Sequence, residues 1–296
     1  MDPKRTGMLD VPGAQLYHEV FGDDGPLLLM IPGGLGDAGF YSSVAPTLAD
    51  CFTVVTYDRR GNSRSTLDSP PQDLRMDEQT GDAIRLLDAL GGEPAFVFGG
   101  SGGAIVGLDL VAQHPERVRA LVAHEPPVVT LLPDRGTYLR LFDDINDIYH
   151  SEGAEPAMEK FIASYGGDGP PDLEWDPTLP PDPEIQQRFA GNFEFLLAHE
   201  MRPFVRYEPD LDALRAARSS GCRVVLGGGR TGAAHYPYRA GATLADLIGT
   251  EFADFPGDHA GYLGRPRAFA ERLVEVLDDG TIAAMASSRD NPAPRS

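Results

Sequence analysis

"FVFGGSGGA", residues 96–104, places one serine between two pairs of glycines. An apolar run precedes it, and the almost entirely apolar segment "GGAIVGLDLVAQH" follows it. The run predicts a buried strand, and a helix that is apolar nearly all round is also buried. The glycines therefore belong to a tight strand–turn–helix connection and not to a flexible linker, which polar sequence would flank.

This connection matches the pattern Gly-x-Ser-x-Gly, with Gly99, Ser101 and Gly103 in the fixed positions. In such a turn the serine backbone is strained and its hydroxyl stands above the sheet, while side chains two positions away would clash. The backbone N–H of Gly102 would point to the place where an oxyanion forms. We therefore predict that Ser101 is a nucleophile; the alternative is a tight turn with an incidental serine.

A serine nucleophile needs a base, and the base needs a carboxylate that orients it. Among the seven histidines we predict His259, in the glycine-flanked loop "FPGDHAGY". In the chain order nucleophile, acid, histidine, the base comes last and from such a loop. His235, which follows the run "VVLGGG", is the most serious rival, and a plain surface histidine is the alternative interpretation.

Composition narrows the classes of function. The chain has 296 residues, 42% of them hydrophobic, and a formal net charge of −20. Such a surface repels phosphate backbones and anionic lipids, so we expect no nucleic-acid or membrane partner. The N-terminus has no apolar signal segment, and the strongly apolar run "LLLMI" is too short to span a bilayer. We expect a cytoplasmic protein; no metal or cofactor is implied, and the oligomeric state is not readable.

Short apolar runs alternate with helical patterns, which is typical of an α/β sheet. Most runs are continuous, as in strands buried on both faces, whereas "AQLYHEV" partly alternates, as a strand near the edge would. The predicted strands are 14–20, 27–31, 52–57, 95–98, 120–123, 223–227 and 251–255. The predicted helices include 77–90, 102–114, 184–200 and 267–277.

The alternation stops between Pro126 and about Arg218, where the pattern predicts several helices and no strand. Within this stretch, residues 166–183 hold six prolines and three glycines, which predicts a loop. A helical excursion between two core strands indicates a lid inserted into one domain. The predicted organisation is a core at 1–126 and 219–279, a helical lid at 127–218, and a disordered tail at 280–296.

Several stretches resemble the α/β-hydrolase superfamily: "YDRRGNSRS" (57–65), "GGSGG", "AQHPERVRALVAHEPP" (112–127) and "GDHAGY". The resemblance extends from about residue 14 to residue 278. Within the superfamily, "IPGGLGD", "LVAHEPP" and the implied triad are similar to zearalenone lactonases and related bacterial esterases. The resemblance implies an α/β-hydrolase fold, in which helices flank a mostly parallel eight-stranded sheet and an all-helical lid is inserted.

The position of the acid departs from the commoner family pattern. Many members place it after the strand that here ends "VVLGGG", but this chain has no Asp or Glu from there until Asp246. Lactonases and haloalkane dehalogenases place it after the strand that follows the nucleophile, a position that here is Glu125. The resemblance therefore implies Glu125 as the acid; the alternative is a glutamate that caps the chain's exit before two prolines. The resemblance likewise implies that the Gly34 N–H is the second oxyanion donor.

These residues predict a serine hydrolase that cleaves a carboxylic ester or lactone through an acyl-enzyme. Dehalogenase and epoxide hydrolase chemistry is disfavoured, because the family nucleophile there is Asp and here it is Ser101. Aromatic residues in the predicted lid suggest a small apolar substrate. Leu35 and the only tryptophan, Trp175, are candidate substrate contacts, and the tryptophan lies in an irregular loop that could close over a substrate.

Two other classes of function stay open. Residues 34–39, "GLGDAG", fit the pattern G-x-G-x-x-G after a strand, and Asp58 ends the next strand about 20 residues on. That is a dinucleotide fingerprint, which would make the chain an NAD(P)-dependent oxidoreductase. It leaves "GGSGG" and "GDHAGY" unexplained. The third class is a catalytically silent hydrolase fold that acts as a ligand receptor. The predicted triad argues against this class.

Overall fold

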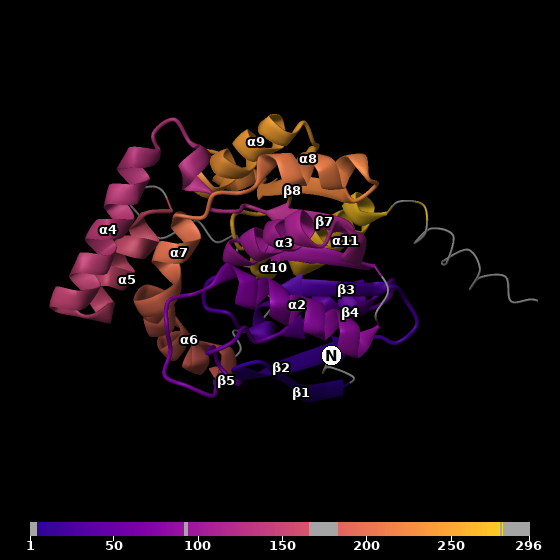
Figure 1. The fold of residues 1–296 in the computed structure, drawn as a ribbon, viewed down its shortest axis with the longest axis horizontal. Helices are drawn as coiled ribbons and strands as arrows, with labels where there is room; N and C mark the ends of the chain where they lie inside the picture. The colour runs from indigo at the N-terminus through magenta and orange to yellow at the C-terminus, as the bar shows by residue number, and fades with distance from the viewer. Residues whose placement is uncertain (1–4, 92–93, 166–182, 279, 281–296) are drawn as a thin grey trace, which may run out of the picture.

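Nine strands form one sheet in the computed structural model, which describes residues 5–91, 94–165, 183–278 and 280 (Figure 1). Their order across the sheet is β1-β2-β4-β3-β6-β7-β8-β9, and the short β5 pairs with β2. The strands are β1 (Arg5–Val11), β2 (Ala14–Phe21), β3 (Leu27–Ile31), β4 (Thr53–Tyr57), β5 (Thr66–Leu67), β6 (Ala95–Gly100), β7 (Val118–His124), β8 (Arg223–Gly229) and β9 (Phe252–Phe255).

The sheet is parallel from β4 to β9 and antiparallel where β2 pairs with β1, β4 and β5. Eight strands form the continuous path, so the expected mostly parallel eight-stranded sheet is confirmed, with β5 as a two-residue addition. All seven predicted strands are present. Parallel pairing brings the carboxyl ends of β3, β6, β7 and β8 to the same edge, which is where ligands bind in such sheets.

Helices cover both faces of the sheet, and further helices lie beyond its edge (Figure 1). None of the described helices is both long and apolar enough to cross a bilayer. The α-helices are α1 (Ala45–Leu48), α2 (Met76–Leu90), α3 (Gly102–Gln113), α4 (Arg135–Glu152), α5 (Ala154–Ala163), α6 (Pro183–Phe195), α7 (Met201–Val205), α8 (Leu211–Ser219), α9 (Tyr236–Ile248), α10 (Gly261–Gly264) and α11 (Pro266–Leu277). The shorter turns are η1 (Ala38–Tyr41), η2 (Pro115–Arg117), η3 (Val129–Leu131), η5 (Arg230–Gly232) and the π-helical η4 (Leu196–Glu200).

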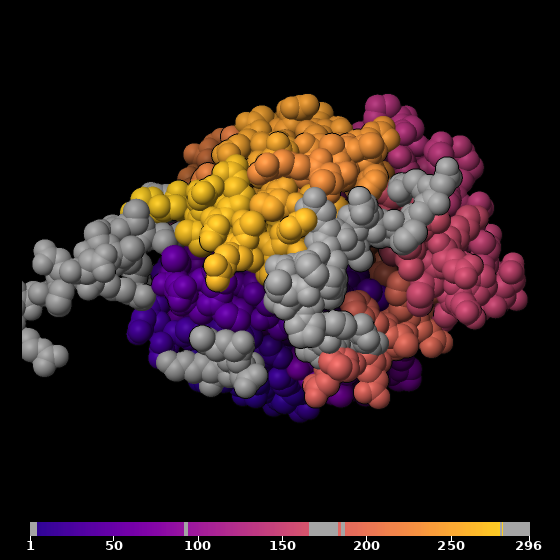
Figure 2. Space-filling model, turned by 180° about the vertical axis from the view of Figure 1, so that it is seen from behind, coloured from indigo at the N-terminus to yellow at the C-terminus, as the bar shows by residue number. Residues whose placement is uncertain are grey.

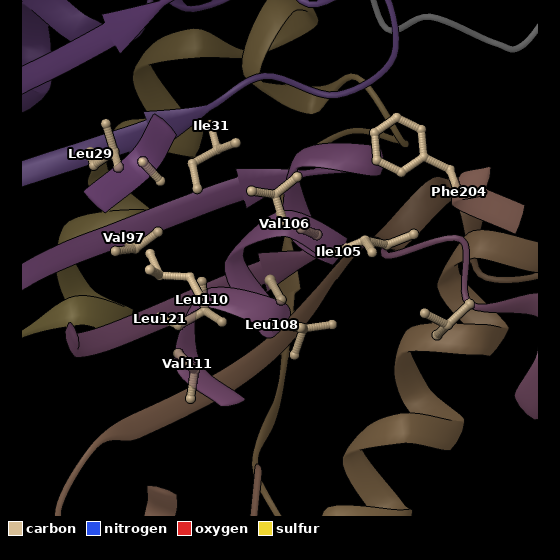
Figure 3. Packing of buried hydrophobic residues seen from close by; sticks show 14 of the residues in the cluster. Leu29, Ile31, Val97, Ile105, Val106, Leu108, Leu110, Val111, Leu121 and Phe204 are labelled. Atoms are coloured by element: carbon tan, nitrogen blue, oxygen red, sulfur yellow. The ribbon is translucent and has the colours of Figure 1, made fainter. Parts of the chain in front are cut away.

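The core consists of two apolar layers, one on each face of the sheet. Because successive side chains of a strand point to opposite faces, Leu29 of β3 joins the layer under α2 and α3, whereas Leu28 joins the layer under α1 and α11. The α3 helix is buried along most of its length, as its apolar sequence predicts. Figure 3 shows its Val106 and Leu110 among the side chains of the strands.

Helices α4 to α7 follow β7 and lie together at one side of the molecule in both views (Figures 1 and 2). The next helix, α8, packs against α3 and α9 on the sheet. The division into a core and a lid stays a prediction. Trp175, nearly all of the loop predicted at 166–183, and nearly all of the tail predicted at 280–296 lie outside the described residues.

His124, the last residue of β7, lies in an aromatic cage with its whole side chain buried. Among the described residues, neither ring nitrogen has a hydrogen-bond partner. Four aromatic rings have centroids 5.3 to 6.3 Å from its own: Phe98, Phe255, Tyr262 and Phe269. Burial disfavours the charged imidazole and lowers the pKa of His124 to about 4, although the neighbouring Glu125 opposes this change.

We expect His124 to make the folded protein less stable in mild acid. The unfolded chain binds this proton with an ordinary pKa of 6.5, but the folded protein binds it only near pH 4. The free energy of unfolding therefore falls as the pH drops through this window, by up to ~1.4 kcal/mol per pH unit. His124→Phe removes the titration, so urea unfolding between pH 4 and 6.5 should show a flatter pH dependence than wild type. An equally steep decline in the variant would assign the effect to other groups.

Candidate active site

Ser101 stands between the end of β6 and the start of α3 with φ 54° and ψ −122°. This is a strained conformation for a residue with a side chain. Its N–H donates to the His124 carbonyl over 2.9 Å. A Cβ atom added to Gly99 would lie 2.3 Å from the Gly103 carbonyl oxygen, and one added to Gly103 would lie 2.1 Å from that of Ile31. The close packing explains both glycines of the motif.

Glu125 directly follows β7 and is fully buried. Its own φ is 49°, the left-handed region that few non-glycine residues adopt. One carboxylate oxygen accepts a hydrogen bond from Gly229 N at 2.8 Å, and the other lies 2.6 Å from His259 Nδ1. Burial alone would raise the pKa of Glu125. The hydrogen bond with His259, its charge and the hydrogen bond from the Gly229 N–H together hold the pKa of Glu125 below its ordinary value. Glu125 is therefore ionised at neutral pH.

His259 lies in the loop after β9, and its side chain is 18% exposed. When Nδ1 carries the proton and donates it to Glu125, Nε2 has a lone pair that can accept another proton. His235 also lies at this end of the sheet, but the Glu125 carboxylate is bonded to His259 and Gly229. The geometry thus favours His259 over its rival as the base.

Ser101 and His259 border two neighbouring cavities. A cavity of ≈ 30 Å³ is lined by Ser101 and a larger one of ≈ 520 Å³ by His259, and Phe161 and Tyr165 line both. The hydrogen bonds of the described residues do not include one between Ser101 and His259. Catalytic hydrogen bonds of this kind commonly tighten only when substrate binds. The structure therefore joins Glu125 and His259 directly, and it brings Ser101 and His259 together through the cavities that they border.

Tyr165, which follows α5, is a site residue that nothing in the sequence marks. Its ring centroid lies 4.9 Å from that of His259. Burial raises the pKa of the Tyr165 hydroxyl, and hydrogen bonding with Tyr236 and Ser101 opposes this rise. The hydroxyl is therefore protonated at neutral pH and can donate a hydrogen bond next to Ser101.

Gly34 and Gly102, the predicted oxyanion donors, both line the small cavity beside Ser101. Among the hydrogen bonds of the described residues, neither glycine N–H has an acceptor. The preceding residue, Gly33, approaches the serine turn so closely that an added Cβ would lie 2.7 Å from the Gly100 carbonyl oxygen and 2.9 Å from Ser101 Cβ. The arrangement leaves two backbone N–H donors beside Ser101.

The larger cavity is mainly apolar. Leu35, a predicted substrate contact, is in its lining, whereas Trp175, the other one, is outside the described residues. Its larger aliphatic and phenylalanine side chains come from the loop after β3 and from α5 and α6: Leu35, Met158, Phe161, Ile162, Phe189 and Phe193. The cavity can thus hold an apolar group next to His259.

Asp58, the acidic residue that a dinucleotide fingerprint at 34–39 would need, is not available to bind a ribose. The Asp58 carboxylate is buried and accepts hydrogen bonds from Ala38 N at 2.8 Å and from the Arg64 guanidinium at 2.7 and 2.8 Å. A dinucleotide fingerprint needs that carboxylate for the ribose hydroxyls. In this chain it fixes the loop that carries Gly34.

Residues 26–195 match the model of the α/β hydrolase fold family, and the chain belongs to this family. It is 36% identical to the uncharacterized hydrolase YraK of Bacillus subtilis, over 92% of this chain and 96% of that protein. A zearalenone hydrolase from Cladophialophora bantiana is 27% identical, over 92% of this chain and 96% of its own. The family confirms the predicted fold class, and the alternative of a Rossmann oxidoreductase is wrong.

A solved structure of a thermophilic esterase from Thermogutta terrifontis has a TM-score of 0.70 to this chain. The two sequences are 20% identical, over 92% of this chain and 98% of the esterase. At this identity the likeness concerns the fold alone.

Proposed function

We propose that this hydrolase cleaves a carboxylic ester or lactone, with Ser101 as nucleophile, His259 as base and Glu125 as the acid that orients the base. One observation carries the proposal: a fully buried, ionised Glu125 lies 2.6 Å from His259 Nδ1 at the sheet edge where Ser101 holds its strained turn. A buried carboxylate paired with a histidine beside a serine turn has the geometry of acyl transfer.

The reaction follows from these positions. Ser101 Oγ attacks the carbonyl carbon while its proton passes to His259 Nε2. The carbonyl oxygen becomes an oxyanion, which accepts hydrogen bonds from the N–H groups of Gly34 and Gly102. The tetrahedral intermediate collapses, the bond to the alcohol oxygen breaks, and His259 gives the proton to the leaving alcohol. Water, deprotonated by His259, then attacks the acyl-enzyme, and the acid leaves as Ser101 regains its proton. Throughout, Glu125 stabilises the imidazolium.

The substrate we propose is neutral and mostly apolar. The cavity of ≈ 520 Å³ beside His259 is lined chiefly by aliphatic and aromatic side chains, and such a site favours apolar groups over charged ones. The net charge of −20 disfavours polyanionic substrates further. Because one relative is a zearalenone hydrolase, zearalenone belongs among the compounds to test.

The experiment that tests the function is a hydrolysis screen of esters and lactones of graded size, including zearalenone, with Ser101→Ala as the control. The proposal expects turnover of at least one class by the wild type and its loss in the variant. A folded wild-type protein that binds these compounds without hydrolysing any of them would instead support the catalytically silent receptor.

We expect the larger cavity to set substrate size. Ile162 lines it and is 38% exposed on α5, so a larger side chain there can fill the cavity without entering the core. Ile162→Trp should lower kcat/KM for the bulkiest ester of the screen by ~10-fold, the scale of an overpacking cost of about 1–3 kcal/mol. The smallest ester should change little. Leu247→Trp, at a similarly exposed site on α9 outside the cavity lining, is the matched control. Equal losses for both esters would exclude this role for the cavity.

A further inference from the structure

We propose that the α6–η4 segment, residues 183–200, holds the loop that carries Gly34 in the position needed to bind an oxyanion. Asn192 and Glu200 are the positioning residues of this segment. The inference rests on the proposed function, because the direction of the Gly34 N–H matters only when an oxyanion forms at Ser101. It assigns a role to a segment far along the chain, because Asn192 lies 157 residues after Leu35.

The loop has a backbone that needs outside support. Gly36 N donates to the Gly33 carbonyl over 3.1 Å, so residues 33–36 form a tight turn. Leu35 within that turn has a φ of 71°, which residues with a side chain adopt only when the surrounding structure holds them there. The turn therefore depends on contacts made by other parts of the chain.

Asn192 of α6 supplies one of these contacts at Leu35 itself. Its Nδ2 donates to the Leu35 carbonyl at 2.7 Å and lies 2.7 Å from Ser63 Oγ, and its Oδ1 accepts the Ser63 N–H at 2.8 Å. The side chain is almost fully buried, and Ser63 also has a positive φ, 49°. One amide thus fixes two strained residues at once.

Glu200 of η4 supplies the second contact through Arg59. The guanidinium and the carboxylate form two hydrogen bonds of 2.6 and 2.7 Å, and their side chains are 0% and 1% exposed. The other guanidinium donors of Arg59 reach the Gly33 carbonyl at 2.9 Å and the Pro32 carbonyl at 3.0 Å. Glu200 therefore holds an arginine that in turn holds the two carbonyl groups before Gly34.

The planarity of the peptide bond links these contacts to the oxyanion donor. The Gly33 carbonyl and the Gly34 N–H belong to one trans peptide unit, so they point in opposite directions. While Arg59 binds the Gly33 carbonyl, the Gly34 N–H must point away from Arg59, and Gly34 lines the cavity of Ser101. Leu196 of η4 closes the other side, since a Cβ on Gly34 would lie 3.2 Å from its side chain.

The test uses Asn192→Asp and the smaller Asn192→Ala in the full chain. Either change removes the donor to Leu35, while the aspartate keeps the size of the side chain and the acceptor for Ser63. We expect kcat to fall ~10- to 100-fold with KM little changed, because a misaligned oxyanion donor loses part of the 10²- to 10³-fold that its removal costs. Circular dichroism checks the folding of both variants. One variant that folds is enough to test the proposal.

The second readout is the inhibition constant of a long-chain alkyl trifluoromethyl ketone. Ser101 Oγ adds to its carbonyl carbon, the carbonyl oxygen becomes an oxyanion, and the serine proton moves to His259. A positioning role predicts that this ketone binds more weakly in proportion to the loss of kcat/KM, which a purely structural role would not produce.

Glu194→Gln is the matched control, because Glu194 is exposed on the same helix and, among the hydrogen bonds of the described residues, has none to residues 32–37. It should change kcat and ketone affinity less than ~3-fold, because substitutions at exposed positions away from such contacts have small effects. The proposal is overturned if the Asn192 variants only lower the melting temperature, or if Glu194→Gln has the same kinetic effect. A wild type that neither hydrolyses esters nor binds the ketone would overturn the proposed function itself, and this inference with it.

Discussion

Replacing Ser101 by alanine is expected to lower kcat by at least ~10³-fold, the scale seen when a triad nucleophile is removed. Alanine fits the same strained turn as serine, so the fold and KM should change little. Steady-state kinetics on the best substrate of the screen, with circular dichroism of the variant, measure this. The rate that persists comes from the oxyanion donors and from binding.

Ser151→Ala is a suitable control for this experiment. Ser151 is exposed on α4, where its hydroxyl donates to the Asp147 carbonyl at 2.7 Å. It should retain full turnover. Unchanged turnover in Ser101→Ala would show that Ser101 is not the nucleophile, whatever the roles of the other residues.

The second large effect is expected from Glu125→Gln, which should lower kcat by ~10³- to 10⁴-fold. Glutamine keeps the shape of the buried side chain but removes the charge that stabilises the imidazolium of His259. Its amide also presents a donor where His259 Nδ1–H needs an acceptor, which favours the wrong tautomer. KM should change little, because Glu125 lines neither cavity.

The controls for Glu125→Gln are the later acids of the chain. Asp246 on α9 and Asp254 on β9 are exposed, so Asp246→Asn and Asp254→Asn should cost less than ~10-fold. Asp258, directly before His259, is buried, and its Oδ1 accepts the Ala260 N–H at 2.9 Å. If Glu125→Gln kept most activity while loss of one of these acids abolished it, the acid would be reassigned, and Ser101 and His259 would keep their roles.

The interior strands could be predicted from the sequence because they are buried on both faces. Such strands leave continuous apolar runs, and the predicted bounds of β3, β4, β6, β7 and β8 lie within two residues of those in the structure. β1 was not predicted, because it is an edge strand whose residues are mostly exposed. Its sequence, "RTGMLDV", therefore has little apolar pattern, and pairing with β2 determines its conformation.

The site could be predicted only where local sequence determines geometry. The glycines around Ser101 are required by the close packing of its own turn, so the motif is visible in the sequence. The pairing of Glu125 with His259 joins residues 134 positions apart, and only family order indicated it. Tyr165, which follows α5, and Asn192 on α6 reach the site through tertiary packing, which no local pattern encodes.

Labelling with a fluorophosphonate probe, followed by mass spectrometry, shows whether Ser101 is an activated nucleophile. An activated serine hydroxyl displaces fluoride from the probe, so we expect a single adduct, on the peptide that contains Ser101, and none in Ser101→Ala. An adduct on a different residue, or a folded wild-type protein that takes no label, would rule out Ser101 as the nucleophile.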